Sequence, residues 1–157
     1  MKLENLLEDI KEEDLDIEKI KYWWGRYKTH DETFLNFLKS LKSKIKIKYP
    51  KVLYRGLYID KSNYNPTKLK NGLKSWSKNI SYAKKYASSG KYVKNPLMVL
   101  FIWNNPDNSK IYIDGNDLNK IIKKDILDQN EYIADSSSAK IIKEYKKEKF
   151  IIVELEG

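Results

Sequence analysis

The sequence predicts an α+β fold, and three observations lead to this class. Apolar residues keep helical spacing over the first 48 residues, whereas most of the later chain carries the patterns of short strands. Helices that come first and strands that come later argue against a parallel doubly wound sheet, in which the two alternate. The length of 157 residues suits one domain with its own core. We expect a single domain over residues 1–157, helical over 1–48 and mainly β over 49–157.

The first 48 residues contain three stretches that predict helices. The first has apolar residues at helical spacing, the second ends at Gly25, and the third has Asp31 as a plausible N-cap. The apolar face of the third consists of Phe34, Leu35, Phe37, Leu38 and Leu41. Trp23 and Trp24 in the second stretch are expected to pack helices onto a sheet, since aromatic side chains dominate core burial; a stacking surface is the alternative.

The later chain predicts seven strands and two helices. The strands are expected at 52–59, 72–77, 97–103, 110–113, 131–134, 139–145 and 149–155. The last three are closely spaced, as in an antiparallel meander. One helix is expected from about Asn79 to Ala87, with Ala83 and Tyr86 on its inner face, and a short one from Asp117 to Lys124. Residues 62–71 are interpreted as a polar loop.

The net charge of +9, from 31 Lys and Arg against 22 Asp and Glu, favours acidic partners such as nucleic acid, an anionic cofactor, an acidic protein or a membrane surface. The excess is nearly all Lys, so the codon bias of an AT-rich genome explains it equally well. Only Arg26 and Arg55 are arginines. Each is therefore more informative, because Lys cannot copy the planar fork of a guanidinium.

The rare residue types exclude several kinds of site. The chain has no Cys and a single His, His30, which excludes disulfides, thiolate catalysis, Cys-ligated zinc and multi-His metal sites. We expect no metal. The N-terminus lacks the apolar region of a signal peptide, and no apolar run reaches the length of about 20 residues that spans a bilayer. We therefore expect a cytoplasmic protein without a membrane partner, and we also expect a monomer.

Three short motifs lie in strand contexts that suit a common site. Arg55 stands in a predicted strand and is followed by Gly56, and Ser75-Trp76-Ser77 ends the next strand before a helix. The third motif, Gln129-Asn130-Glu131, opens a late strand. A carboxylate at Glu131, the first residue of the predicted strand, is held by a rigid element and can still reach a cleft. Taken alone, each motif is better explained without a function: Arg55 by a solvent-facing strand position, Ser75 and Ser77 by a turn, and Glu131 by an exposed acid.

Together, the motifs and their order resemble the Arg–Ser–Glu class of ADP-ribosyltransferases, the superfamily of the clostridial Rho-modifying exoenzymes. The resemblance covers roughly residues 20–155 by inspection. It implies a split antiparallel β-sandwich with a central NAD cleft, and N-terminal helices packed on it. Trp76 stands where the family usually has Thr. The resemblance also implies a glycosyltransferase that uses NAD as substrate, with NAD glycohydrolase activity as a side reaction.

The resemblance assigns a role to each motif. Glu131 would stabilise the oxocarbenium-like centre that forms when the nicotinamide–ribose bond breaks, and Ser75 would hold Glu131 by a hydrogen bond. Arg55 would bind the diphosphate. Gly56 and Ser77 belong to the same NAD-binding motifs. The 88–96 loop corresponds to the family's phosphate–nicotinamide loop, so Tyr86 or Tyr92 is a candidate to stack on nicotinamide, and Lys91 or Lys94 to face phosphate.

Gln129 occupies the family's target-recognition position, two residues before the catalytic Glu. In this family a Gln there accompanies modification of Asn or of guanine bases, and a Glu accompanies modification of Arg. An amide both donates and accepts, as a neutral acceptor requires. We expect a macromolecular acceptor, either a protein side chain other than arginine, modified by a bacterial toxin or phage effector, or a base of DNA or RNA. A non-catalytic basic binding module with the same fold is the third hypothesis.

Overall fold

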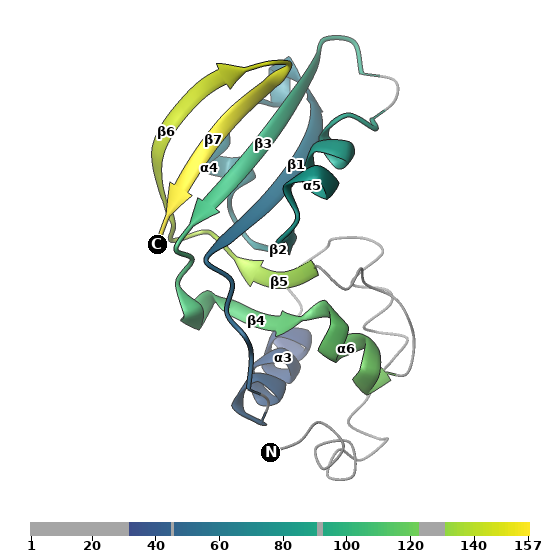
Figure 1. The fold of residues 1–157 in the computed structure, drawn as a ribbon, viewed down its shortest axis with the longest axis vertical. Helices are drawn as coiled ribbons and strands as arrows, with labels where there is room; N and C mark the ends of the chain where they lie inside the picture. Colours follow the sequence, from purple (N-terminus) through teal and green to yellow (C-terminus); the bar gives the residue numbers. More distant parts are fainter. Residues whose placement is uncertain (1–31, 45, 91–92, 123–130) are drawn as a thin grey trace. The chain divides into compact units, whose positions relative to one another are not determined.

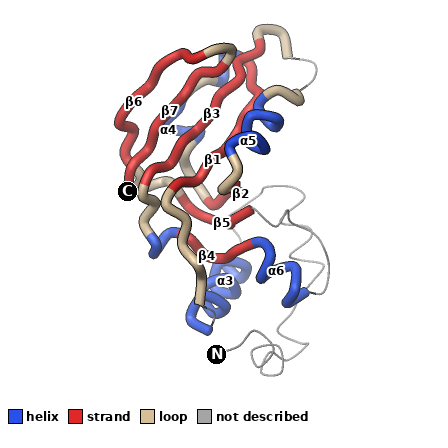
Figure 2. The backbone as a smooth tube through the Cα atoms, viewed as in Figure 1, coloured by secondary structure: helices blue, strands red, loops and turns tan. Residues whose placement is uncertain are grey.

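The computed structural model describes residues 32–44, 46–90, 93–122 and 131–157, with seven strands and six helical segments within these ranges (Figures 1 and 2). The helices expected before residue 31, with Trp23, Trp24 and His30, lie outside the described residues, as do Asp31, Tyr92 and Gln129. The helical segments are α3 (Glu32–Lys44), η2 (Lys61–Asn63), α4 (Pro66–Leu69), α5 (Ile80–Ala87), η3 (Asn108–Lys110) and α6 (Gly115–Ile122). The strands are β1 (Val52–Asp60), β2 (Leu73–Ser77), β3 (Pro96–Asn104), β4 (Ile111–Asp114), β5 (Glu131–Asp135), β6 (Lys140–Lys147) and β7 (Phe150–Glu156).

The strand order is β4-β5-β2-β1-β3-β7-β6. All seven predicted strands are present within a few residues of their expected bounds, and the mixed helix-and-sheet class is confirmed. The expectation of a wholly antiparallel core is wrong at one place, because β3 and β7 pair in parallel, with Phe101 opposite Val153. The expected meander is wrong as well. Of its three strands only β6 and β7 are neighbours, whereas β5 lies elsewhere in the order.

The stretch predicted as a polar loop also differs from expectation, since it contains η2 and α4. Asp60 begins η2 by accepting a hydrogen bond from the Ser62 amide. Asn65 caps α4 through its side chain, and Pro66 occupies the first turn. An Asn-Pro pair favours the start of a helix. Asn caps the first turn, the fixed φ of proline suits the first helical position, and an N–H is not needed there.

Two compact units make up the described part of the chain. One comprises the described residues up to Lys48 together with Tyr112–Ile133. Leu38 and Leu41 of α3 are buried in it, as the predicted apolar face of that helix requires, and Ile47 and Ile113 are buried too. The hydroxyl of Tyr132 donates to the carbonyl of Lys48 at 3.2 Å. The second unit, Tyr49–Ile111 and Ala134–Gly157, contains β1, β2, β3, β6 and β7.

One face of the second unit's sheet has an aromatic core. Trp76 of β2 lies edge-on to Phe101, with ring centroids 6.4 Å apart, and tilts against Trp103 at 5.2 Å. Leu53, Val99, Val153 and Leu155 of the neighbouring strands are fully buried. The continuous apolar run that was predicted to be a central strand is β3. It lies between β1 and β7, and this central position explains why it lacks polar alternation.

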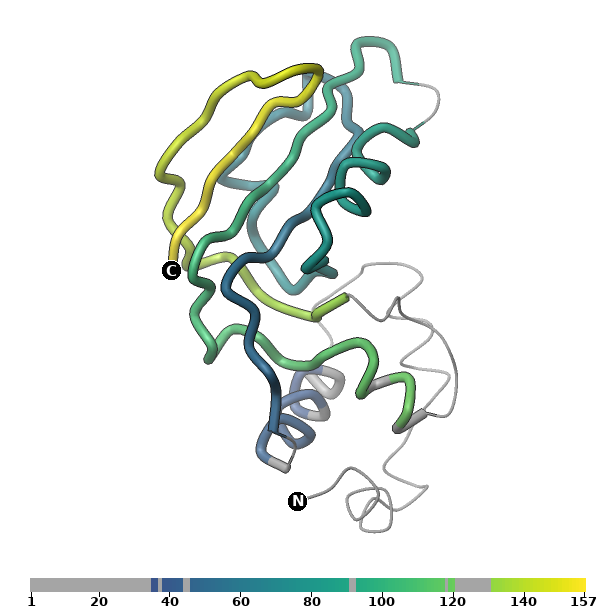
Figure 3. The backbone as a smooth tube through the Cα atoms, in the orientation of Figure 1, coloured from purple at the N-terminus to yellow at the C-terminus, as the bar shows by residue number. Residues whose placement is uncertain are grey.

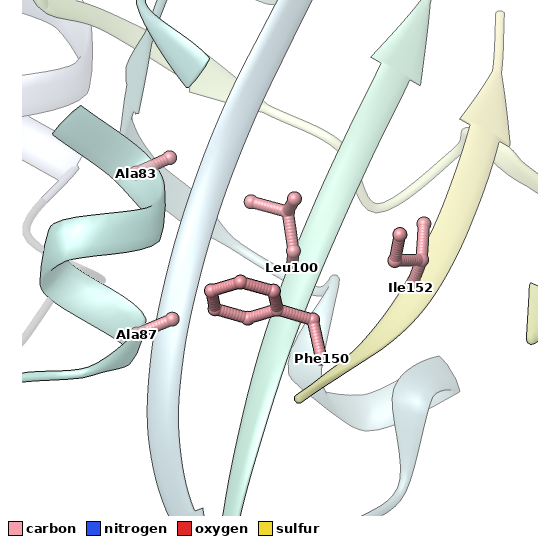
Figure 4. Close-up of a cluster of buried hydrophobic side chains, with 5 residues drawn as sticks. All are labelled: Ala83, Ala87, Leu100, Phe150 and Ile152. Atoms are coloured by element: carbon pink, nitrogen blue, oxygen red, sulfur yellow. The ribbon is translucent and has the colours of Figure 1, made fainter. Parts of the chain in front are cut away.

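Helix α5 covers the opposite face. Ala83 and Ala87 point from α5 toward Leu100, and Phe150 and Ile152 of β7 complete the cluster (Figure 4). The backbone trace shows α5 lying alongside β1 (Figure 3). Two alanines on the inner face allow the helix to approach closely, so α5 is held tightly on the strand that carries Arg55.

Candidate active site

Arg55 and Ser75 are brought together by adjacent strands. Tyr54 of β1 pairs with Ser77 of β2 in antiparallel register. Arg55 Nη1 donates to the backbone carbonyl of Ser75 at 3.1 Å, and both residues are partly buried. This hydrogen bond fixes one end of the Arg55 guanidinium and so orients its plane. Two of the motifs that lie 20 residues apart in the sequence therefore meet in space.

Trp76, the departure from the family pattern, has a packing role. Its side chain is 1% exposed and fills the aromatic core beside Phe101. Phe101 is also the β3 partner of Arg55 in the register, and paired residues project to the same face of a sheet. The Arg55 side chain therefore leaves the sheet on the Trp76 side. The indole nitrogens of Trp76 and Trp103 are buried and, within the described residues, have no hydrogen-bond acceptor.

Ser77 and Asn79 together start α5. The Ser77 hydroxyl accepts a hydrogen bond from the Asn79 amide at 3.0 Å, and Ser77 is buried. The Asn79 side chain then accepts from the amides of Ser81 and Tyr82, which satisfies the open N–H groups of the first turn. This role in a turn accounts for Ser77, whose predicted contact with NAD stays a prediction.

Gly56 is required by the packing of α5. A Cβ atom there would lie 1.8 Å from the carbonyl oxygen of Ala83 and 2.8 Å from the amide nitrogen of Ala87. Both are backbone atoms, so rotation of a side chain cannot relieve the clash. The glycine after Arg55 therefore lets the helix contact the strand directly. A direct contact between Gly56 and NAD stays a prediction.

The tyrosine of α5 is not where it was expected. Tyr86 is 52% exposed, so the prediction that it lies on the inner face of the helix is wrong. The inner positions are taken by Ala83 and Ala87, since residues four apart share a helix face. Tyr86 instead packs against Tyr82, with ring centroids 5.5 Å apart. The stacking of Tyr86 on nicotinamide stays a prediction. Lys94 is exposed.

Glu131 is the first residue of β5 and is 8% exposed. A carboxylate is seldom this well buried, since burial disfavours its charged form, and the bland interpretation of Glu131 as a solvated loop acid is therefore wrong. Glu131 belongs to the first compact unit, whereas Arg55 and Ser75 belong to the second. The predicted hydrogen bond from Ser75 to Glu131 stays a prediction.

The far end of β5 is fixed to the turn before β2. Ser136, fully buried, donates its hydroxyl to the Lys70 carbonyl at 2.5 Å. The Lys70 ammonium donates to the Ser137 carbonyl at 2.5 Å, and the Ser137 hydroxyl accepts from the Gly72 amide at 2.7 Å. These bonds hold the ends of the two strands that carry Glu131 and Ser75. No sequence motif marks these residues as functional.

Lys74 is a second cation near Arg55, and it belongs to none of the three sequence motifs. It is partly buried and directly precedes Ser75 on β2. Burial, and after it the charge of Arg55, lowers the pKa of the Lys74 ammonium below its ordinary value. The alternation of β2 is the signal that could have found it. Lys74 and Trp76 share a face of the strand, which is the face of Arg55.

The acidic groups near Tyr132 belong to the first unit. Burial, followed by the charges of Asp114 and Asp117, raises the pKa of Tyr132 to about 12. Burial and the charge of Asp114 also raise the pKa of Asp117. Asp117 therefore stabilises the fold at low pH, and this contribution is lost as pH rises through its folded-state pKa.

In the described ranges, no three His, Cys, Asp or Glu side chains are placed to hold a metal ion.

Among the described helices, none is long and apolar enough to cross a bilayer.

No protein-family model matches the chain, and no curated protein matches it in sequence. The fold is similar to that of Vis, an ADP-ribosyltransferase toxin from Vibrio splendidus.

For the structure of Vis with the M6 inhibitor, the TM-score is 0.50 at 14% identity, over 97% of this chain and 72% of that chain. Vis itself and its complex with agmatine each give 0.49 at 14% identity, over 97% of this chain and 72% and 73% of theirs. At this identity the likeness concerns the fold alone. The chain has the fold of an ADP-ribosyltransferase.

Proposed function

We propose that the chain is an NAD-dependent mono-ADP-ribosyltransferase of the Arg–Ser–Glu class. The observation that carries the proposal is the likeness in fold to Vis over 97% of this chain. The bond from Arg55 to the Ser75 backbone supports it, because it joins two of the three sequence motifs on neighbouring strands. The split of the sheet into two layers around an NAD cleft, the N-terminal helices and the single-domain organisation are parts of this proposal.

The proposed roles divide between binding and catalysis. Arg55, Ser75, Ser77 and Gly56 form the NAD-binding motifs, and Tyr86 and Tyr92 are the candidates to stack on nicotinamide. Glu131, with Ser75 as its partner, stabilises positive charge on the ribose, and Gln129 orients the acceptor. The burial of Glu131 supports its role, because a carboxylate shielded from water stabilises a nearby positive charge more strongly.

In the proposed reaction the bond between the ribose C1′ and the nicotinamide nitrogen breaks, and nicotinamide leaves with the bonding electron pair. The ribose C1′ carries the resulting positive charge, which the Glu131 carboxylate stabilises. The acceptor atom then bonds to C1′ and releases its proton. Water in place of the acceptor gives free ADP-ribose, which is the NAD glycohydrolase side reaction.

The first candidate for the acceptor is a protein side chain other than arginine, for which Gln129 is the reason. We propose that the enzyme is a bacterial toxin or a phage effector that acts in a cytoplasm as a monomer. An amide at the recognition position both donates and accepts hydrogen bonds, which suits a neutral amide acceptor.

A base of DNA or RNA is the second candidate, favoured by the charges of one edge strand. Strand β6 ends the sheet order and, with the following turn, exposes Lys140, Lys143, Lys146, Lys147 and Lys149. Clustered lysines attract phosphate backbones. They also keep an edge strand from pairing with other chains.

Labelled NAD and a cell lysate distinguish the candidates. The protein is incubated with both, and the labelled products are digested with protease or with nuclease. Label released by protease identifies a protein acceptor, and label released by nuclease identifies a nucleic acid. If neither transfer nor nicotinamide release occurs, the chain is a non-catalytic basic module and the proposal is wrong.

Replacement of Arg55 by Lys is expected to weaken NAD binding by about 10-fold or more. The charge is kept, but the fork that donates to the Ser75 carbonyl and to phosphate oxygens together is lost. Calorimetric titration with NAD measures the change. An unfolding midpoint close to that of the parent protein serves as the control, and an unchanged NAD affinity would remove Arg55 from the phosphate site.

Replacement of Gln129 by Glu is expected to change the acceptor and leave NAD hydrolysis within about 3-fold of the parent rate. The reason is that a carboxylate pairs with a cationic guanidinium, whereas Gln129 has no part in breaking the bond to nicotinamide. Label transfer to arginine-containing and asparagine-containing peptides measures the acceptor, and nicotinamide release measures hydrolysis. Loss of both activities together would contradict the proposed division of roles.

A further inference from the structure

Lys74 is placed beside Arg55 by the geometry of two strands. It lies on β2 directly before Ser75, whose carbonyl accepts the hydrogen bond from Arg55 at 3.1 Å. Two residues further on, Trp76 contacts Phe101, the register partner of Arg55. Because strand side chains alternate between faces, Lys74, Trp76 and Arg55 lie on the same face of the sheet.

Two partly buried cations on one face are an unfavourable pair in the ligand-free protein. Burial disfavours the charged form of a lysine, and a neighbouring positive charge disfavours it further. Both effects act on Lys74, in that order, and lower its pKa. In the described part of the chain no carboxylate is paired with the Lys74 ammonium. Packing alone gives no reason to place an ammonium group there.

Room is available for the Lys74 side chain to bend along its strand. Its Cε lies 3.7 Å from the point where a Cβ of Gly72 would stand, so the apolar stem passes over a glycine. Gly72 has a φ of +93°, a backbone conformation that favours glycine. The apolar stem of Lys74 is therefore supported by the backbone at Gly72.

We propose that Lys74 binds the diphosphate of NAD together with Arg55, each cation taking one of the two phosphate groups. The inference rests on the proposed function and adds a substrate-binding residue to it. The chemistry is complementary, since a guanidinium offers a planar fork and an ammonium a compact charge on a flexible stem. A diphosphate brings two negative charges, which turns the mutual repulsion of the two cations into shared attraction for one ligand.

The proposal predicts effects of opposite sign on stability and on binding. Lys74→Met keeps the apolar stem and removes the charge. It is expected to raise the unfolding midpoint of the ligand-free protein by about 2 °C or more, because it relieves burial of a charge and repulsion from Arg55. The same change is expected to weaken NAD binding about 10- to 100-fold, the typical effect of losing a hydrogen bond to a charged group. A merely structural lysine would lower stability and binding together.

The experiment measures NAD affinity by calorimetry and the unfolding midpoint with and without inorganic pyrophosphate. Parent protein, Lys74→Met and Lys74→Arg are compared with Lys78→Met. Lys78 is exposed and directly follows β2, which makes it the matched control. Lys74→Arg keeps the charge and is expected to bind NAD within about 5-fold of the parent affinity. Pyrophosphate is expected to stabilise the parent protein more than Lys74→Met.

A pH series gives an independent readout. Only the protonated Lys74 attracts phosphate, so the NAD affinity of the parent is expected to fall as pH rises through the lowered pKa of Lys74. The profile of Lys74→Met is expected to be flatter over the same range. Over that range the stability of the ligand-free parent changes in the opposite direction, because the unfolded chain holds the proton more tightly and stability therefore rises with pH.

The outcomes separate this inference from the proposed function. If the parent protein binds no NAD, the proposed function is wrong and the assignment of Lys74 falls with it. If the parent binds NAD and Lys74→Met binds it equally well, the Lys74 assignment alone is wrong. Weaker binding accompanied by an unchanged or higher midpoint supports the assignment, whereas weaker binding with a lower midpoint overturns it.

Discussion

Replacement of Glu131 by Gln is expected to lower the rate of nicotinamide release from NAD by about 100- to 1000-fold. Glu131 is 8% exposed at the start of β5. Its negative charge is proposed to act on the positive charge that develops at the ribose, and a neutral amide of the same shape lacks that effect. Because this interaction is strongest in the transition state, the loss should appear in kcat rather than in NAD affinity.

Release of labelled nicotinamide at saturating NAD measures the effect, and calorimetry measures NAD affinity in parallel. Glu156→Gln at the exposed end of β7 is the matched control, since it makes the same change of charge on another strand. The unfolding midpoint shows whether the Glu131 variant folds. A folded variant that releases nicotinamide at a rate near that of the parent would remove Glu131 from the catalytic role.

Replacement of Gly56 by Ala is expected to destabilise the protein by about 3 kcal/mol or more, at or above the upper end of the usual effect of overpacking. The new methyl group would lie 1.8 Å from the Ala83 carbonyl oxygen, so α5 has to move away from β1. Urea unfolding at constant pH measures the loss. Because α5 follows the Ser75–Ser77 segment directly, lower NAD binding is expected to accompany it.

Two further variants test the cause. Ala83→Gly in the Gly56→Ala background is not expected to restore stability, because the clash is with the backbone of residue 83 and not with its methyl group. Gly157→Ala is the control for loss of glycine's conformational freedom without a clash, since Gly157 has a φ of +81° but no atom lies within 4 Å of the position of its added Cβ. Weaker NAD binding without any loss of stability would indicate that Gly56 serves the ligand and not the packing.

The pattern of apolar and polar residues predicted the positions of the strands well, because the features that favour a strand lie within its own short stretch of sequence. The apolar run over 97–103 became β3, and the alternating stretch around Arg55 became β1. The N-terminal half of α5 was equally predictable, since Asn79 caps its first turn. Helix α4 was missed although Asn65 and Pro66 mark its start. Its four residues are too few to show any apolar period.

Which strands become neighbours was not predictable in the same way. The parallel pairing of β3 with β7 joins segments about 50 residues apart, and the register depends on which apolar faces fit together. Nearness in the sequence favoured a meander of the last three strands, whereas burial of Val153 and Leu155 beside Phe101 and Trp103 places β7 next to β3. Tyr86 was misplaced for a related reason, because only the approach of α5 to Gly56 shows which helix face is inward.

The sequence by itself determined the residue chemistry, the α+β class and the three motifs whose order resembles an ADP-ribosyltransferase. The tertiary structure decided which residues of the chain contact one another. It joined Arg55 to the Ser75 backbone, gave Gly56 a packing role, buried Trp76 and placed Lys74 beside the guanidinium. The physical reason is that chemistry resides in single side chains, whereas burial, register and the repulsion between charges depend on segments that meet only after folding.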